Sequence, residues 1–431
     1  MQITPVTAGR SPRVLIVGAG FAGINAALSL RGAHAQVTMV DRKNHHTFQP
    51  LLYQVALAVL SPAEIASPVR TILRGQKHTE VLMGEVVGFD LKARNALLKN
   101  GSRLEYDYLI VAAGSTHSYF GHEEWAVDAP GLKTLEDAIE IRRRVLLAFE
   151  LAEKQVLENA PHPTPLNFVV IGAGPTGVEL AGAISDIARH YMTRDFHHID
   201  PRQARIMLLE GGPRVLAAYP EDLSASAERQ LRDLGVEVRN NTRVTGIEPG
   251  VVLVGEERIA AAVIVWAAGV AASPLGKMLG APTDKTGRVM VDAELNIPGH
   301  PEVFVLGDLA AREQDGHGLP GLAPVAIQMG KWVAKTITRD INGEPRKPFH
   351  YFDKGTMATI GRNKAIAQIG KIHLSGVIAW LAWLFIHIMY LVGFRNRLLV
   401  LTEWAWTYFA VQQGSRLITG DTNLIGWGNA D

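Results

Sequence analysis

The chain has 431 residues, balances 43 Lys and Arg against 42 Asp and Glu, and is 47% hydrophobic with 42 glycines. This length exceeds one hydrophobic core and predicts two or three domains. The near-neutral charge, without a basic stripe, argues against a nucleic-acid partner. Cysteine is absent, which excludes disulfides, thiolate nucleophiles and cysteine-held zinc or iron–sulfur centres. Because Met1–Arg13 lacks the features of a secretory or transit signal, we expect the protein to stay where it is made.

The first part of the chain reads as strand, glycine turn, helix and strand. An apolar run at Val14–Val17 precedes the turn, an Ala-rich stretch reaches Leu30, and a second run at Val37–Val40 ends at Asp41. The turn consists of Gly18, Ala19, Gly20, Phe21, Ala22 and Gly23. Its glycines allow a tight turn, close approach of a pyrophosphate and close helix–strand packing. Asp41 is placed to accept ribose hydroxyls, so this unit predicts dinucleotide binding.

The same pattern returns about 150 residues later, and such self-similarity strengthens both matches. Phe168–Ile171 precedes the second turn, a helix runs through Ile187, and the strand Arg205–Leu209 ends at Glu210 after an insertion around residues 192–203. The turn consists of Gly172, Ala173, Gly174, Pro175, Thr176 and Gly177. An acid at the strand end favours NADH over NADPH, a preference that the nearby Arg214 would weaken.

Two such units predict an α/β protein with two Rossmann-like dinucleotide-binding domains. The economical interpretation is one tightly held flavin and one diffusing nicotinamide; the alternative is that one unit is purely structural. Further strands are expected at Tyr108–Ala112, Ala262–Trp266 and Val303–Leu306, each followed by small residues or glycine. The proline-rich stretch at residues 160–165 is expected to be the hinge into the second unit.

Several segments resemble the FAD signature of the two-dinucleotide-binding flavoprotein superfamily: the first turn with Asp41, the strand end Val111–Gly114, and Val303–Asp308. Within that superfamily the chain is similar to type II NADH dehydrogenases, single-subunit NADH:quinone oxidoreductases that pump no protons. The segments that carry this resemblance are Phe48–Gln54, Gly174–Leu180, Pro324–Gly330, Lys354–Ala358 and the aromatic tail around Phe394–Arg397. The chain departs from the family at Pro324 and Met329, where glutamines are frequent, a difference that concerns the quinone pocket.

The residues and the resemblance together imply two bound cofactors, FAD and NADH. The positions expected to bind FAD are Gly18, Gly20, Phe21, Ala22, Gly23, Asp41, Arg42, Gln54, Val86, Ala113, Gly114, Gly307, Asp308 and Lys354. Those expected to bind NADH are Gly172, Gly174, Pro175, Thr176, Gly177, Glu179, Glu210, Ala268 and Gly269. The resemblance gives Asp308 a contact with the ribityl chain or the pyrophosphate. Its alternative role is the N-cap of a helix at Leu309–Ala311.

Glu179 and Gln328 are the expected catalytic residues. Hydride transfer needs an oriented stack of rings rather than a protein nucleophile, which explains how a cysteine-free chain can be a redox enzyme. The resemblance places Glu179 near the stacked rings, whereas its alternative role is to offset the dipole of its helix. Quinone reduction consumes two protons, and Glu179, Gln328 and Lys354 are relay candidates. Gln328 equally fits a residue that only satisfies backbone groups. His45 and His46 are expected at the flavin entrance, without metal-ligand spacing.

The tail differs from the rest of the chain, since five of the eight tryptophans lie beyond residue 370. Leu374–Phe394 holds one ionisable residue, His387; Arg395–Arg397 then interrupts, and an apolar run resumes from Leu398 to Val411. The first run is long enough to cross about 30 Å of hydrocarbon. Trp and Tyr spread along both runs, with flanking basic residues, favour helices that lie in the membrane interface instead. The resemblance also implies such a monotopic anchor. A spanning helix and a buried homodimer interface are the alternatives.

We therefore expect an FAD-binding domain in residues 1–122 and 291–350, an NADH-binding domain in 123–290 and a membrane-anchoring domain in 351–431. The expected function is electron transfer from NADH through FAD to ubiquinone or menaquinone, on the cytoplasmic face of the inner membrane. Alternatives are an NADH-dependent reductase of a small electron-carrier protein and a flavin-binding, redox-sensing interaction protein. Disulfide reductases and sulfide:quinone reductases are excluded because they require cysteines.

Overall fold

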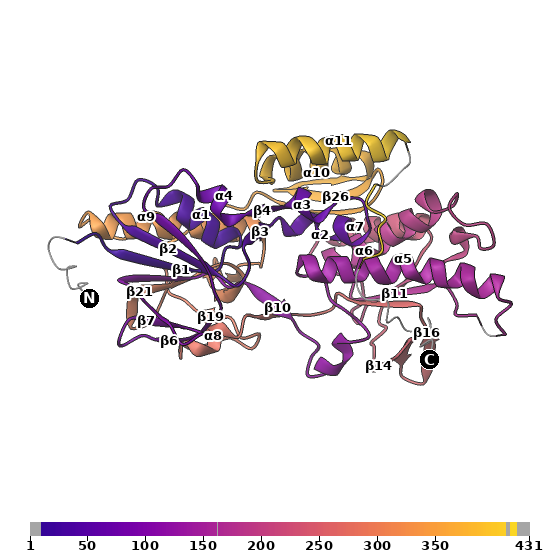
Figure 1. Cartoon of the computed structure of the whole chain (residues 1–431), viewed down its shortest axis with the longest axis horizontal. Coiled ribbons are helices and arrows are strands. Elements are labelled where there is room, and N and C mark those ends of the chain that lie inside the picture. Colours follow the sequence, from indigo (N-terminus) through magenta and orange to yellow (C-terminus); the bar gives the residue numbers. More distant parts are fainter. Residues whose placement is uncertain (1–9, 162, 411–413, 420–431) are drawn as a thin grey trace. The chain divides into compact units, whose positions relative to one another are not determined.

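The computed structural model describes residues 10–161, 163–410 and 414–419 and divides into two compact units (Figure 1). Unit 1 comprises Met1–Thr47, Ala66–Thr116 and Val270–Asp353. Unit 2 comprises Phe48–Ile65, His117–Gly269 and Lys354–Asp431. Most of the opening stretch Met1–Arg13, one residue of the proline-rich stretch and Val411 at the end of the tail lie outside the described residues.

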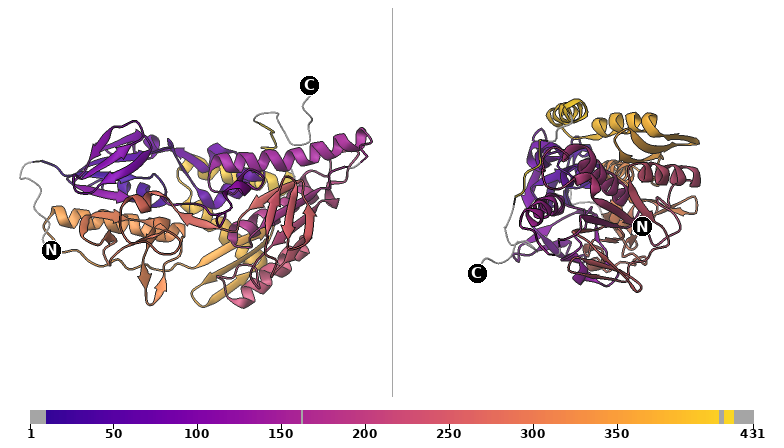
Figure 2. Two further views of the ribbon diagram at one scale, coloured as in Figure 1. Left: turned by 90° about the horizontal axis from the view of Figure 1, so that it is seen from below. Right: turned by 90° about the vertical axis from the view of Figure 1, so that its right-hand side faces the viewer.

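Unit 1 is built on a six-stranded sheet with the order β20-β21-β9-β1-β2-β5. Its strands are β1 (Arg13–Val17), β2 (Gln36–Asp41), β5 (Thr79–Met83), β9 (Tyr108–Val111), β20 (Asn296–Ile297) and β21 (His300–Val305). Every pairing except β20 with β21 is parallel. The central strands are almost wholly buried Val, Ile and Leu, as expected for a parallel sheet covered on both faces. The helix α9 (Ala323–Ile341), orange in Figures 1 and 2, packs on α1 (Phe21–Ser29).

Short elements complete unit 1. These are β3 (His45–Thr47), β4 (Ala66–Pro68), α4 (Val69–Leu73), β6 (Val86–Asp90), β7 (Asn95–Leu98), β8 (Arg103–Glu105), β18 (Val270–Ala272), α8 (Leu275–Met278), β19 (Val289–Met290), β22 (Ala310–Ala311), β23 (Glu313–Gln314) and β24 (His317–Gly318), with the 3-10 turn η5 (Gly307–Leu309). The strand β10 (Ser115–His117) crosses the boundary between the units.

Unit 2 contains a four-stranded parallel sheet with the order β13-β12-β11-β17. Its strands are β11 (Asn167–Ile171), β12 (Arg205–Leu209), β13 (Val236–Arg239) and β17 (Val263–Trp266). The helices of this part are α2 (Leu52–Ala56), α3 (Pro62–Ile65), α5 (Leu135–Leu157), α6 (Pro175–Asp186) and α7 (Glu221–Asp233), with the short turns η1 (Gln49–Leu51), η2 (Glu123–Ala126), η3 (Ile187–Tyr191) and η4 (Pro201–Gln203). The predicted repeat of strand, turn, helix and strand is therefore confirmed in both units.

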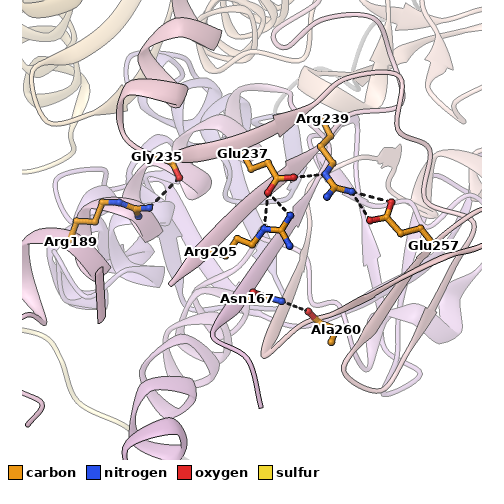
Figure 3. A network of polar contacts seen from close by, with 8 residues as sticks. All are labelled: Asn167, Arg189, Arg205, Gly235, Glu237, Arg239, Glu257 and Ala260. Carbon is orange, nitrogen blue, oxygen red and sulfur yellow. Dashed lines mark hydrogen bonds and ion pairs between the residues drawn. The ribbon is translucent and has the colours of Figure 1, made fainter. Parts of the chain in front are cut away.

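One edge of this sheet carries a chain of ion pairs (Figure 3). Glu237 on β13 accepts from Arg205 Nε at 2.7 Å and from Arg239 Nε at 2.6 Å. Arg239 also donates to Glu257 at 2.9 Å, on the small antiparallel sheet of β14 (Gly246–Glu248), β15 (Val251–Val254) and β16 (Glu257–Ala260). Such partly exposed pairs each contribute little, about 0.2–1 kcal/mol, so we assign them to sheet alignment.

The C-terminal part of unit 2 is an antiparallel sheet followed by two helices. The strands are β25 (Thr356–Gly361), β26 (Lys364–Ile369) and β27 (Ile372–Ser375), and the helices are α10 (Gly376–Tyr390) and α11 (Phe394–Ala410). The helix α10 packs on β26, and α11 runs beside α10 (Figure 1). The helix α6 packs directly on β25, because a Cβ at Gly182 would lie 1.6 Å from the Ile360 carbonyl oxygen. This packing groups residues from 354 onward with residues 117–269, where the sequence suggested separate domains.

Two sequence expectations differ from the structure. The apolar run at 374–394 is divided: Leu374 and Ser375 end β27, α10 stops at Tyr390, and Gly393 turns the chain at φ 90°. Residues 395–397 therefore lie inside the first turns of α11 and do not interrupt it. The stretch at 160–165 joins α5 to β11 within unit 2, so it is not the hinge between units. Within the described residues, no helix is both long and apolar enough to cross a bilayer.

The contact between α1 and α9 gives the first prediction. A Cβ at Gly330 would lie 2.2 Å from the Ala22 carbonyl oxygen, so Gly330→Ala must push the two helices apart. We expect it to cost about 1–3 kcal/mol of stability, seen as a lower thermal unfolding midpoint. The neighbouring Lys331 is exposed, and Lys331→Ala is the matched control. Equal midpoints for the two variants would contradict this packing.

Candidate active site

The first turn, Gly18–Gly23, is locked by its own backbone. Gly18 has φ 104°, and a Cβ there would lie 2.4 Å from the Ala112 oxygen. A Cβ at Gly23 would lie 1.9 Å from the Gly18 oxygen. The carboxylate of Asp41 accepts hydrogen bonds from the backbone N–H of Ala19 at 2.6 Å and of Lys43 at 2.7 Å. Glycine is thus required at both positions, and Asp41 holds the turn against the strand end.

The second turn, Gly172–Gly177, repeats this arrangement in unit 2. Gly172 has φ 98°, and a Cβ there would lie 2.5 Å from the Ala268 Cα. A Cβ at Gly177 would lie 1.8 Å from the Gly172 oxygen. Glu210 accepts from the backbone N–H of Ala173 and of Gly212, each at 2.7 Å. The duplication inferred from sequence therefore extends to the hydrogen bonds of the two acids.

Both turns fit a dinucleotide. The helices α1 and α6 begin at Gly20 and Gly174, which have extended backbone and no side-chain cap. A Cβ at either glycine would meet no protein atom within 4 Å. Uncapped N–H groups at a helix start, next to open space, are what a pyrophosphate needs. Each carboxylate oxygen of Asp41 and Glu210 also retains a lone pair with which to accept a ribose hydroxyl.

Other predicted FAD positions gather in unit 1 around the strand ends. Gly114 and Gly307 both have φ 66°, and Asp308 accepts from the Ser115 hydroxyl at 2.9 Å. The 3-10 turn at 307–309 leads into β22 and not into a helix, so the N-cap alternative for Asp308 is wrong. Of the remaining positions, Ala113 follows β9, Val86 is buried at the start of β6, and Arg42 is exposed.

A buried histidine contacts two residues of the first turn. His46 is 3% exposed, its Nδ1 lies 2.9 Å from the Ala19 oxygen, and its ring meets the edge of Phe21 with centroids 5.1 Å apart. Burial lowers the pKa of His46, so the ring is neutral at physiological pH. His45 Nδ1 lies 3.0 Å from the Asn44 side-chain oxygen. Among the described residues there is no cluster of three or more His, Asp or Glu side chains suited to hold a metal ion.

Two predicted FAD positions, Gln54 and Lys354, belong to unit 2. The buried amide of Gln54 donates to the Tyr53 hydroxyl at 2.8 Å and accepts from Trp404 Nε1 at 2.7 Å. Lys354 donates to the Tyr390 hydroxyl at 3.0 Å. Both side chains thus connect to α10 or α11, contacts that the sequence did not indicate.

Gln328, expected to be catalytic, has a clear structural role in unit 1. Its amide nitrogen donates to the Phe352 carbonyl at 2.9 Å, and its amide oxygen accepts from the Phe352 N–H at 3.0 Å. This reciprocal pair fixes the end of the chain segment that leaves α9. These contacts fit the alternative role of Gln328, a residue that satisfies backbone groups.

Glu179 lies one turn into α6 and borders a small cavity of about 80 Å³, also lined by Tyr53, Lys133 and Thr176. Burial raises the pKa of Glu179 to about 8, although the Thr359 backbone N–H donates to its carboxylate. Glu179 therefore carries a proton at neutral pH. A neutral acid does little to offset a helix dipole, so the geometry disfavours that alternative.

An aromatic cluster beneath α10 was not predicted. The ring of Trp383 stacks on His387 with centroids 4.1 Å apart and approaches Trp404 at 5.7 Å and Tyr53 at 6.4 Å. Burial lowers the pKa of His387 to about 4, and its Nδ1 lies 2.8 Å from the Trp383 oxygen. The sequence held one signal for this cluster, since His387 is the one residue of residues 374–394 whose side chain ordinarily ionises near neutral pH. The tryptophans stood out only by their number in the tail, and that number did not predict their contacts.

Two nucleotide-binding units of this geometry in one chain define a class of oxidoreductases that use two dinucleotides. A family model described as pyridine nucleotide-disulphide oxidoreductase matches residues 12–330, and a model described as NDH2 C-terminal domain matches residues 353–411. The chain is 45% identical to the type II NADH:quinone oxidoreductase NdhA of Mycobacterium tuberculosis, over 96% of this chain and 91% of that protein. The chain belongs to the family of type II NADH:quinone oxidoreductases, which are flavoenzymes.

Two further comparisons agree with this assignment. The chain is 44% identical to the type II NADH:quinone oxidoreductase Ndh of Mycobacterium tuberculosis, over 95% of this chain and 91% of that protein. The structure of NDH2 from Plasmodium falciparum in complex with RYL-552 has a TM-score of 0.83, with 19% identity over 95% of this chain and all of that one. This last likeness concerns the fold. The resemblance inferred from sequence motifs is confirmed.

His387 gives a pH-dependent prediction. Its lowered pKa means that, between about pH 6.5 and 4, the unfolded chain binds a proton that the folded chain does not. Stability therefore falls as pH decreases through this window, by up to about 1.4 kcal/mol per pH unit. His387→Phe keeps the ring stack and should flatten this slope in denaturant unfolding followed by tryptophan fluorescence. His78→Phe, at an exposed position, should leave the slope as in the parent; equal slopes for all three proteins would contradict the assignment.

Proposed function

We propose that this protein transfers electrons from NADH to a membrane quinone, ubiquinone or menaquinone, with FAD held in unit 1 and NADH in unit 2. The net reaction is NADH + H⁺ + quinone → NAD⁺ + quinol. When bound, the flavin supplies a carrier that accepts two electrons from nicotinamide and passes them on. The observation that carries the proposal is the pair of matched glycine turns, each with its own strand-end acid.

In unit 1, the first turn would hold the pyrophosphate of FAD, and Asp41 would accept from its ribose. Gly114 and Gly307, both in left-handed backbone conformation, let the chain pass close to the cofactor. Asp308 already accepts from Ser115 through one oxygen, and its carboxylate has further lone pairs with which it would accept hydrogen bonds from FAD. Arg42, Val86 and Ala113, also in unit 1, are proposed to line this site.

In unit 2, the second turn would hold the pyrophosphate of NADH, and Glu210 would accept from the 2′-hydroxyl of its ribose. A 2′-phosphate would meet this carboxylate and be repelled. Arg214, which could have relieved that repulsion, donates instead to the backbone oxygens of Tyr219 at 2.8 Å and Ala217 at 2.9 Å. The contacts of Arg214 therefore support a preference for NADH over NADPH.

Glu179 is proposed as the acid nearest the reacting rings. It stands three residues beyond Thr176 of the second turn and borders the small cavity. With a pKa near 8, it holds a proton that it can give up during quinone reduction. Gln328 is proposed as a positioning residue, because both of its amide atoms hold Phe352.

Substitution of each strand-end acid should affect one dinucleotide and not the other. Glu210→Gln loses a charge-assisted acceptor worth about 1.5–3 kcal/mol, so the KM for NADH should rise at least tenfold while FAD content stays near one per chain. Asp41→Asn should lower FAD content and leave the KM of the remaining holoenzyme unchanged. Flavin absorbance and steady-state kinetics measure both. An Asp41→Asn protein with full flavin and a raised KM would reverse the assignment.

The proposed membrane contact uses one face of each C-terminal helix. Exposed apolar side chains recur along α10 and along α11, mostly three to five residues apart, which places them on one face of each helix. They are Val377, Ile378, Leu381, Phe385, Met389, Phe394, Leu398, Leu401, Trp406 and Phe409. We propose that this face, the apolar face, enters the bilayer surface on the cytoplasmic side of the inner membrane. A homodimer that covers part of it is compatible with that contact.

Quinone turnover in vesicles tests the proposal. Wild-type protein with anionic lipid vesicles that carry ubiquinone or menaquinone should oxidise NADH continuously. Phe385 and Phe394 are 69% and 82% exposed, so Phe385→Ser with Phe394→Ser should weaken vesicle binding and lower quinone turnover at least tenfold while flavin content is kept.

The matched control is Val127→Ser, since Val127 is 73% exposed and lies outside the apolar face. It should bind vesicles and turn over like the parent. Oxidation of NADH that stops after one flavin equivalent, with quinone present, would favour a redox sensor. Turnover that requires a small electron-carrier protein and ignores quinone would favour a carrier reductase.

A further inference from the structure

The helix α6 runs beside the strand β25 in unit 2, and three contacts join α6 to β25 and to Arg362, the residue that follows this strand. The Thr359 N–H donates to Glu179, the Ile360 oxygen faces Gly182, and the Arg362 N–H donates to Asp186 at 3.1 Å. The seven-residue step along α6 covers about 10.5 Å, and the three-residue step along the strand covers about 10 Å. The two paths therefore stay in register, and Glu179 and Asp186 lie on the same face of α6.

A cavity borders each end of this contact. The small cavity, of about 80 Å³, lies at Glu179 and Tyr53. The large cavity, of about 420 Å³, lies at Asp186 and is lined by Arg189, His190, Asp233, Arg362 and Lys364. Either volume holds water molecules at polar walls. Water thus has access to an acid at both ends of the α6–β25 contact.

The surroundings of Asp186 favour its protonated form. Its side chain is 14% exposed, and its Oδ1 is buried without a hydrogen-bond partner among the described residues. Burial raises the pKa of Asp186, against the charges of His190, Arg362 and Arg189. His190 Nδ1 lies 3.7 Å from Oδ1. A buried carboxyl oxygen without a donor favours the protonated form.

The nearby cations are engaged elsewhere. Arg189 donates to the Ser185 hydroxyl at 2.9 Å and to the Gly235 oxygen at 3.1 Å. The guanidinium of Arg362 donates to the Tyr408 oxygen at 2.8 Å and lies over the Tyr408 ring. Lys364 pairs with Asp233 at 3.0 Å. None of these three side chains makes a hydrogen bond to Asp186 Oδ1, and the ion-pair partner of Oδ1 is His190, at 3.7 Å and charged only when protonated.

Tyr53 and Thr359 supply hydroxyl groups near the two acids. Tyr53 is 8% exposed, and a side-chain hydrogen bond joins its hydroxyl to Thr359, whose backbone N–H reaches Glu179. Burial and the charges of Glu179 and Asp186 raise the pKa of Tyr53 well above its ordinary value. Tyr53 therefore stays protonated, and the charges of both carboxylates act on it. A hydroxyl of this kind accepts and donates at once, as a proton relay requires.

We propose that Asp186 is the entry point for the proton that quinone reduction consumes. This inference rests on the proposed function. Asp186–COOH gives its proton through the Tyr53 and Thr359 hydroxyls and water to Glu179–COO⁻, and Asp186–COO⁻ regains a proton from water in the large cavity. The transfer supplies the single H⁺ of the net reaction NADH + H⁺ + quinone → NAD⁺ + quinol. Asp186 acts through Glu179 and is a positioning and relay residue.

Two electron acceptors separate proton supply from electron transfer. Ferricyanide takes electrons without protons, whereas a quinone needs both. Asp186→Asn should lower NADH:quinone turnover at least tenfold at pH 7 and leave NADH:ferricyanide turnover within twofold. Formate or acetate, small acids that fit the large cavity, should restore part of the quinone turnover, and Asp186→Glu should restore most of it. In the wild type, quinone turnover should fall as pH rises through about 8, the pKa of Glu179.

The matched control is Asp233→Asn, which removes a carboxylate from the same cavity and should leave both activities near wild type. Quinone turnover of Asp186→Asn equal to that of Asp233→Asn would overturn the relay and leave the proposed function intact. An equal loss of turnover with both acceptors, without rescue by small acids, would give Asp186 a purely structural role and would also overturn the relay. Wild-type protein that reduces its flavin with NADH yet never turns over quinone would overturn the proposed function itself, and the relay with it.

Discussion

In each unit, a carboxylate at the end of the second strand accepts the backbone N–H of the residue inside the glycine turn, at 2.6 Å for Asp41 and 2.7 Å for Glu210. This hydrogen bond closes the turn over the strand ends. It leaves the first N–H groups of α1 and α6 uncapped and facing open space. An anion at these helix starts is favoured by the helix dipole, and a carboxylate nearby would accept a ribose hydroxyl and repel a ribose phosphate.

The second constraint is the absence of a side chain at Gly182. Because α6 meets the Ile360 carbonyl without an intervening Cβ, the strand β25 lies against the helix that carries Glu179 and Asp186. The C-terminal sheet and the helices α10 and α11 thereby pack as part of unit 2. The aromatic cluster of Tyr53, Trp383, His387 and Trp404 extends this packing. Elements with exposed apolar faces and a candidate proton path thus belong to one packed body.

The sequence predicted what local patterns encode. The strand at Arg205–Leu209 was placed with correct bounds, and both turns and both acids were found, since glycine spacing and strand periodicity act over a few residues. Long-range partnerships were not predicted. Gln54 accepts a hydrogen bond from Trp404, which lies 350 positions further along the chain. Neither residue type predicts that contact. Gln328 was expected either to relay protons or to satisfy backbone groups, and its hydrogen bonds are with the backbone of Phe352. Asp186 was missed because its burial depends on Arg362 and β25, whereas its sequence position fits any helix end.

Arg362 contacts both Asp186 and the helix α11. The backbone N–H of Arg362 donates to Asp186, while its guanidinium lies 4.1 Å from the centre of the Tyr408 ring on α11 and donates to the Tyr408 carbonyl. The helix α11 carries much of the apolar face. A shift of α11 would therefore act on the carboxyl group beside the large cavity through Arg362. Under the proposed membrane contact, lipid composition would then influence the rate at which this carboxyl group exchanges its proton.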